Sequence, residues 1–162
     1  MPAGSTYTPI ATTTLTGGTS YTFSSIPSTY TDLVLVASVA TTSGNSNLAM
    51  QYNGDTGTNY SFTRVYGYSG SAGSGRASNV PDNYFGDIGT TFTSNILHIQ
   101  NYSNSTTNKT AIIRSNDTTS AVQAWVNLWR NTAAINAIKV YPTGGQTFAN
   151  GSMLTLYGIA AA

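Results

Sequence analysis

The sequence predicts an all-β protein, specifically a jelly-roll-like antiparallel β-sandwich of about nine or ten strands. Only 7% of the residues are charged, and the chain has no Glu and two Lys, whereas exposed helix faces favour Glu, Lys and Arg. Ser and Thr supply 46 of the 162 residues, and the β-branched Thr suits strands. Sixteen Gly and fifteen Asn supply residues for turns.

Ten segments alternate between apolar and polar residues and are bounded by turn residues, so we expect each to be a strand. In order they are Tyr7–Leu15, Ser20–Ser24, Thr31–Ala40, Asn47–Tyr52, Asn59–Tyr68, Asn95–Tyr102, Lys109–Arg114, Ala121–Arg130, Ala134–Tyr141 and Ser152–Ile159.

The turn chemistry in the first half of the chain justifies the first five segments. The Thr-rich first strand ends at Gly17-Gly18, and the second stops before Pro27. The third holds the apolar run 33–36 and is typical of a central strand buried on both faces. Asn53-Gly54-Asp55 is a strong turn signal, so we expect 48–52 and 59–68 to pair as a hairpin.

The second half begins with residues 69–83, which are rich in Gly and Ser and predict a long surface loop. The later segments are separated by turns at 104–106, 116–117, 144–145 and 150–151. A short helix over 121–134 is the alternative to a strand there, because Val122, Val126 and Trp129 also fit helical spacing. Asn127 and Asn131 weaken the helical alternative, so we prefer the strand.

The length predicts one domain over residues 1–162, with 1–6 as a short N-terminal extension. The first residues lack the basic and apolar regions of a signal peptide, so we expect synthesis in a cytoplasm. No apolar run reaches the ~18 residues of a membrane span. The net charge is +1 and the six basic residues are scattered, which argues against nucleic acid and against anionic membranes as partners.

The titratable residues do not predict a catalytic site, a metal site or a cofactor site. The single histidine, His98, lies within a predicted strand with no triad partner nearby in the sequence. All five acidic residues lie at strand starts or in turns, where Asp caps the backbone: Asp32, Asp55, Asp82, Asp87 and Asp117. A carboxylate pair Asp82–Asp87 and a Ca²⁺ loop at 53–57 are the alternatives that we consider.

Aromatic residues are the candidate contact residues. Eleven Tyr and two Trp are more than the core of such a domain requires. In an extended strand Trp125 and Trp129 share one face, and Tyr66 and Tyr68 lead into the predicted loop. We expect these four residues to lie in the core, at an interface or at a glycan site.

Several motifs together resemble a group of short virion proteins of tailed phages, notably cyanophages. They cover nearly the whole chain: Tyr7–Leu15, Phe23–Leu35 with Pro27 and Asp32, Asn53-Gly54-Asp55-x-Gly57-x-Asn59-Tyr60-Ser61, Asn101–Asn104 with Asn108-Lys109-Thr110, and Leu156-Tyr157-Gly158-Ile159. We interpret Pro27, Asp55, Gly57 and Gly158 as determinants of the fold.

The resemblance implies an exposed, non-enzymatic component of the virion surface. We expect a capsid decoration protein that contacts the major capsid protein. The alternative is a tail-fibre head that binds a host receptor or glycan. The low charge and the many aromatics also predict a homo-oligomer, with a trimer favoured, whose contact includes Trp125 and Trp129 on outward faces. A polysaccharide-degrading enzyme is disfavoured, because the acid/base pair that it needs is missing.

Overall fold

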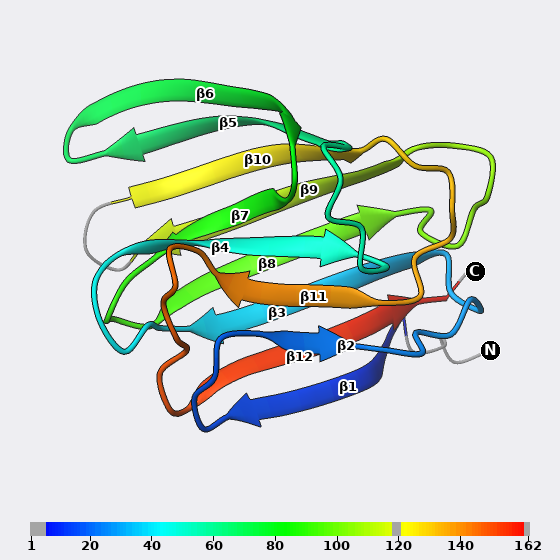
Figure 1. Ribbon diagram of the computed structural model, residues 1–162, viewed down its shortest axis with the longest axis horizontal. Helices are drawn as coiled ribbons and strands as arrows, with labels where there is room; N and C mark the ends of the chain where they lie inside the picture. Colours follow the sequence, from blue (N-terminus) through cyan, green and yellow to red (C-terminus); the bar gives the residue numbers. More distant parts are fainter. Residues whose placement is uncertain (1–5, 118–120, 161–162) are drawn as a thin grey trace.

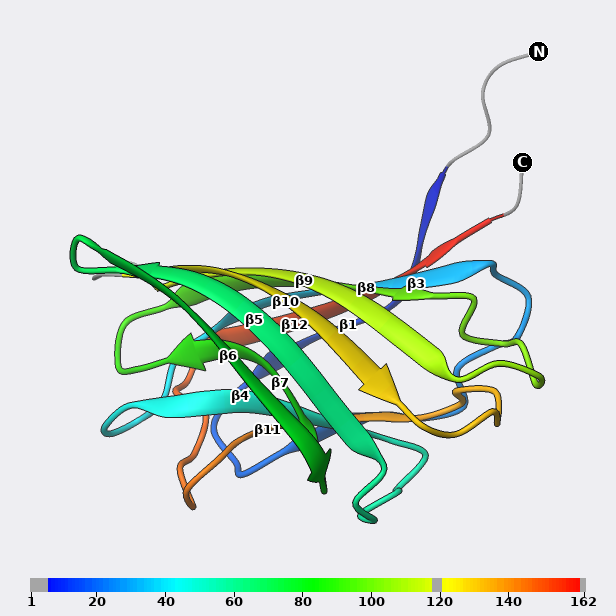
Figure 2. The ribbon, with the colours of Figure 1, turned by 90° about the horizontal axis from the view of Figure 1, so that it is seen from above.

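A computed structural model describes residues 6–117 and 121–160, and it arranges them as strands in two antiparallel sheets that face each other (Figures 1 and 2). The first sheet contains, in spatial order, β1 (Tyr7–Leu15), β12 (Ser152–Ile159), β3 (Asp32–Val39), β8 (Thr93–Gln100), β9 (Lys109–Asp117), β10 (Ala121–Trp129), β5 (Tyr60–Tyr68) and β6 (Ser71–Val80). The second contains β2 (Tyr21–Phe23), β11 (Ile138–Pro142), β4 (Ser46–Tyr52) and β7 (Asn83–Ile88). The all-β prediction is confirmed.

Eight of these strands have jelly-roll connectivity. In a jelly roll the strands of one sheet lie in the order 1-8-3-6 and those of the other in the order 2-7-4-5. The neighbours β1-β12-β3-β8 and β2-β11-β4-β7 reproduce this order when β5, β6, β9 and β10 are left out of the count. These four strands extend the first sheet beyond β8, and we call them the added strands.

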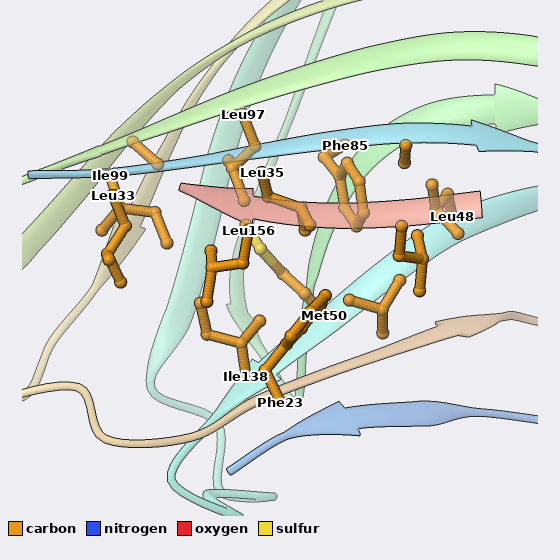
Figure 3. Packing of buried hydrophobic residues seen from close by; sticks show 14 of the residues in the cluster. Phe23, Leu33, Leu35, Leu48, Met50, Phe85, Leu97, Ile99, Ile138 and Leu156 are labelled. Carbon is orange, nitrogen blue, oxygen red and sulfur yellow. The ribbon is translucent and has the colours of Figure 1, made fainter. Parts of the chain in front are cut away.

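The core lies between the two sheets. Leu33, Leu35 and Leu97 point from the first sheet toward Met50 and Ile138 of the second (Figure 3). Burying apolar side chains of this size contributes about 1.5–3 kcal/mol each. β3 is confirmed as an interior strand, since it lies between β12 and β8. Within the described residues, no helix is long and apolar enough to cross a membrane.

The predicted loop over 69–83 is wrong, because β6 and the start of β7 occupy it. The described part of the chain therefore has twelve strands, two more than the ten segments expected to be strands. Ser69 and Gly70 both have positive φ (45° and 82°), as a tight type I′ hairpin turn requires. The small residues of β6 fit its neighbour: a Cβ on Gly73 would lie 2.6 Å from Cζ of the Tyr66 ring.

The predicted hairpin between 48–52 and 59–68 is also wrong. β4 pairs with β11 and β7, whereas β5 pairs with β10 and β6, so the turn carries the chain from one sheet to the other. The Asn53 side chain holds this turn against the segment before β11. Its Oδ1 accepts hydrogen bonds from the backbone N–H groups of Asn136 and Ala137, and its Nδ2 donates to the carbonyl of Ala134.

Three other expectations concern local segments. Residues 121–129 form β10, so the strand is confirmed over the helical alternative. Of the expected N-terminal extension 1–6, only Thr6 lies within the described residues. Gly158 permits close packing, as predicted: a Cβ there would lie 2.3 Å from two atoms of the Tyr30 ring.

Replacing Gly158 by alanine should therefore destabilise the protein. The Tyr30 ring covers Gly158 and would have to move, at an expected cost of about 1–3 kcal/mol. The free energy of unfolding, measured by urea denaturation, checks this. Gly67→Ala is the matched control, because its Cβ would meet Val122 Cγ2 at an ordinary 3.6 Å. Equal stability of the two variants would contradict the packing at Gly158.

Candidate functional site

The exposed apolar residues gather on the added strands. Among the described residues, five of the eight large hydrophobic side chains that are exposed lie there: Val65, Tyr68, Ile112, Val122 and Val126. The strand register places Ile112 opposite Val126, and Val65 opposite the exposed Ala124. We call Val65, Ile112, Val122, Ala124 and Val126 the outer patch, because they share the face of the first sheet that points away from the second.

The outer patch borders a shallow hollow of about 720 Å³. Its small residues, Gly67, Ala72 and Gly73, account for the depression, while Val65 and Val122 stand beside it. Val122 is 66% exposed. Contiguous exposed apolar side chains on a soluble domain mark a surface that another molecule covers. The hollow therefore identifies a candidate contact surface.

The opposite face of the same strands carries a polar and aromatic group. The Arg64 guanidinium carbon lies 4.9 Å from the ring centres of both Tyr66 and Trp125. Arg64 Nη1 lies 3.6 Å from Asp87 Oδ2, which also accepts a 2.5 Å hydrogen bond from Gln123 Nε2. The second sheet covers the first part of β5, where the Phe62 ring packs on Tyr84 of β7 at 5.4 Å between centroids. Figure 1 shows that β6 lies beyond β7.

We call Arg64, Tyr66, Tyr68, Asp87 and Gln123 the overhang site. Tyr68 is 54% exposed and Tyr66 is half-buried, so both rings can contact a ligand. Gln123 Oε1 is buried and has no hydrogen-bond partner within the described residues. Arg64 and Asp87 are both partly exposed, so their ion pair adds about 1 kcal/mol at most. Planar rings beside a guanidinium and an amide suit a polyhydroxylated ligand.

Trp125 and Trp129 do share one face of β10, but it is the inward face. Each is only 1% exposed, so the expectation that they lie on an outward contact surface is wrong. The alternation of side chains along the sequence could not show which face of β10 points inward. Gln123 and Asn127 share the buried face with the tryptophans, while Val122 and Val126 are exposed. Of the four predicted contact residues, Tyr66 and Tyr68 reach solvent.

Trp129 instead belongs to a buried cluster with Tyr52 and Tyr60. Its ring stacks on Tyr60 at 6.2 Å between centroids, and its Nε1 donates a 2.7 Å hydrogen bond to Asp55 Oδ2. Asn59 Nδ2 donates to the same oxygen, and the N–H of Gly57 donates to Oδ1. Burial alone would raise the pKa of Asp55, but these three hydrogen bonds outweigh it and lower that pKa.

Asp55 and Gly57 thus shape the turn, as the sequence predicted. Both carboxylate oxygens of Asp55 already accept hydrogen bonds from N–H groups. In the described ranges, no three His or Asp side chains lie close enough to share a metal ion.

Asp82 and Asp87 also have separate structural partners. Asp82 accepts a 2.6 Å hydrogen bond from the Tyr141 hydroxyl, while Asp87 contacts Gln123 and Arg64. Asp117 lies at the end of β9, and its side chain is outside the described part of the structure.

Sequence reasoning missed one pair, Asp32 and His98. Asp32 Oδ2 lies 2.8 Å from His98 Nε2, and Asp32 Oδ1 accepts the N–H of Asn101. The two side chains are distant in the sequence, and the pairing of β3 with β8 brings them together. No hydroxyl group within the described residues forms a hydrogen bond with His98.

No match was found among protein-family models or among curated proteins.

Proposed function

We propose that this chain is a non-catalytic surface protein of a tailed-phage particle, in the manner of a capsid decoration protein. The jelly-roll strands provide a rigid support, and the added strands provide the contact surface. The observation that carries the proposal is the outer patch, whose valines and isoleucine are exposed on the strands that extend the jelly roll. The resemblance of the sequence to phage virion proteins supports the location.

Copy number tests the location. Quantitative mass spectrometry of particles whose genome encodes this chain should find hundreds of copies per particle if the chain decorates the capsid. Some tens of copies or fewer would assign it to the tail. Its absence from purified particles would overturn the proposal.

The outer patch should also control attachment to the particle. Val122→Thr together with Val126→Thr keeps the side-chain shape but removes apolar surface, so binding to particles that lack the protein should weaken about tenfold. Met153→Thr is the matched control, because Met153 is exposed on β12, outside the added strands. Binding measured by co-sedimentation with particles checks the expectation. Equal binding by the double variant and the wild type would exclude the outer patch.

The overhang site supports a second candidate function, a glycan-binding head of a tail fibre. The exposed ring of Tyr68 beside Tyr66 and Arg64 is the observation that favours it. Stacking of a sugar on these rings predicts that Tyr68→Ala loses retention on host-surface polysaccharide. Tyr7→Ala, which changes another exposed ring on β1, should retain it.

A further inference from the structure

Three of the four sheet edges are protected. β1 contains Pro9, and its pairing with β12 shifts register between Pro9 and Ala11. β2 is three residues long. The edge of β7 docks onto the inner face of the first sheet, where Asn127 Nδ2 donates to the carbonyl of Tyr84 at 2.9 Å. Proline, shortness and covering contacts are the usual ways in which proteins block an edge strand.

The fourth edge, β6, has none of these protections. It is ten residues long, has no proline and carries one charged residue, Arg76. No strand of the described structure pairs with its outer side. Such an edge presents a row of backbone N–H and C=O groups that can pair with another strand.

The hairpin register identifies those groups. The two-residue turn 69–70 makes Tyr68 and Ser71 a hydrogen-bonded pair. Because such pairs alternate along an antiparallel ladder, residues 71, 73, 75 and 77 bond to β5. The N–H and C=O groups of the intervening residues point away from β5, and these residues are Ala72, Ser74, Arg76 and Ser78.

The side chains of β6 leave room for a second strand. On the inner face they are those of Gly73, Gly75 and Ala77. On the outer face Arg76 is the only long side chain, and it is exposed to solvent. No inward-pointing lysine or large ring of β6 would stand in the way of an approaching backbone.

We propose that the occupant of this edge is β6 of a second copy of the chain, paired antiparallel about a two-fold axis at Gly75. In this register Ala72 pairs with Ser78, and Ser74 pairs with Arg76, of the other copy. The outward-pointing backbone N–H and C=O groups of all four residues on each copy then form hydrogen bonds with the other copy. Moving the two-fold axis from Gly75 to Arg76 would pair only three of these residues on each copy. It would also place the two Arg76 side chains opposite each other, and like charges directly opposite are destabilising.

The pairing merges two first sheets into one continuous sheet. Because the axis is perpendicular to that sheet, both outer patches lie on the same side of the dimer. A two-fold contact predicts an even number of chains, in place of the trimer expected from the sequence. The inference concerns the isolated protein, so its failure and the failure of the proposed particle location are separate results.

A designed disulfide tests the register. Two Gly75 residues would form a non-hydrogen-bonded pair with Cα atoms about 4.5 Å apart, within the range that a disulfide spans. The chain has no cysteine, so Gly75→Cys should give a covalent dimer of about 34 kDa, twice the 17.0 kDa of one chain, on mild oxidation. Ala77→Cys is the control, because its two thiols would lie four residues out of register and should stay unlinked.

A proline tests the edge itself. Ser74→Pro removes an N–H that β5 does not use, so the monomer should keep its circular dichroism spectrum and melting temperature but lose self-association in light scattering. Ser74→Thr keeps the N–H and should still dimerise. In the wild type, amide exchange of Ser74 and Arg76 should slow as concentration rises.

Three results would overturn the inference. The first is a wild-type chain that stays monomeric at roughly a hundred micromolar, with fast amide exchange at Ser74. The second is an oligomer that Ser74→Pro leaves intact, which would place the contact on another face. The third is protection of the edge that develops only when another virion protein is added, which would make that protein the occupant.

Discussion

Raising the pH above about 10 should unfold the protein cooperatively. Burial raises the pKa of Tyr52 and of Tyr60 far above the ordinary value of 10.0. In the unfolded chain both hydroxyls ionise near pH 10, so the stability that they contribute is fully present below that pH and is lost as the pH rises. Above pH 10, each of the two tyrosines lowers the free energy of unfolding by about 1.4 kcal/mol per pH unit. Over two pH units, the two tyrosines together remove about as much as the entire stability of a marginally stable domain.

Circular dichroism and tyrosinate absorbance, followed against pH, check this expectation, because unfolding and ionisation should coincide. Two variants separate the roles of the rings. The Tyr52 hydroxyl is buried without a hydrogen-bond partner in the described structure, so Tyr52→Phe should shift the alkaline midpoint upward without a loss of stability at neutral pH. Tyr60→Phe should destabilise even at neutral pH, because the Tyr60 hydroxyl accepts from the N–H of Tyr52 and donates to the carbonyl of Asp55. A fold that persists at pH 12 would contradict the burial.

Asp55→Ala should be among the most destabilising single substitutions, at about 3–5 kcal/mol. It removes an acceptor of three hydrogen bonds and leaves Nε1 of the buried Trp129 without a partner. Hydrogen bonds to a charged group contribute about 1.5–3 kcal/mol each, and contributions within one cluster are not additive. Chemical denaturation monitored by tryptophan fluorescence measures the loss.

The same carboxylate should make stability depend on acid. Because the pKa of Asp55 is lower in the folded protein, its contribution is present above about pH 4 and is lost as the pH falls through the folded-state value. Asp55→Asn should flatten this part of the stability profile. Asp87→Asn is the control, since Asp87 is 40% exposed and pairs with Arg64 across 3.6 Å. An unchanged acid profile in Asp55→Asn would show that another group causes the dependence.

Sequence patterns predicted strands well where side chains are β-branched or aromatic. The bounds of β1, Tyr7–Leu15, agree with the prediction to the residue. β6 was missed, because its Ser, Ala and Gly residues carry no strand preference of their own. What makes it a strand is the positive φ at Ser69 and Gly70 and the ring of Tyr66 over Gly73. The Ser69-Gly70 dipeptide is a local turn signal, but the segment after it lacks the β-branched and aromatic residues by which strands are recognised.

The contact residues were harder to predict than the fold. The structure leaves two of the four predicted contact residues accessible, since Tyr68 is 54% exposed and Tyr66 is half-buried beside Arg64. The expectation that Trp125 and Trp129 face outward was wrong. Hydrophobicity alone does not tell the two faces of β10 apart, because valines line the exposed face and Gln123 and Asn127 lie on the buried one. The signal for the outer patch was the alternation of Val122, Ala124 and Val126 with Gln123, Trp125 and Asn127. Which of these two faces is exposed depends on where the second sheet lies.

The position of β12 has a consequence for how the chain folds. β12 lies between β1 and β3, so the last described strand to leave the ribosome inserts between two of the earliest. Until then β1 has no partner, and one edge of the apolar strand β3 is open. Pairing of such distant segments must close nearly the whole chain, which slows folding. The nascent chain therefore passes through a stage in which β3 can pair wrongly, and chaperones that hold unpaired strands should increase its yield.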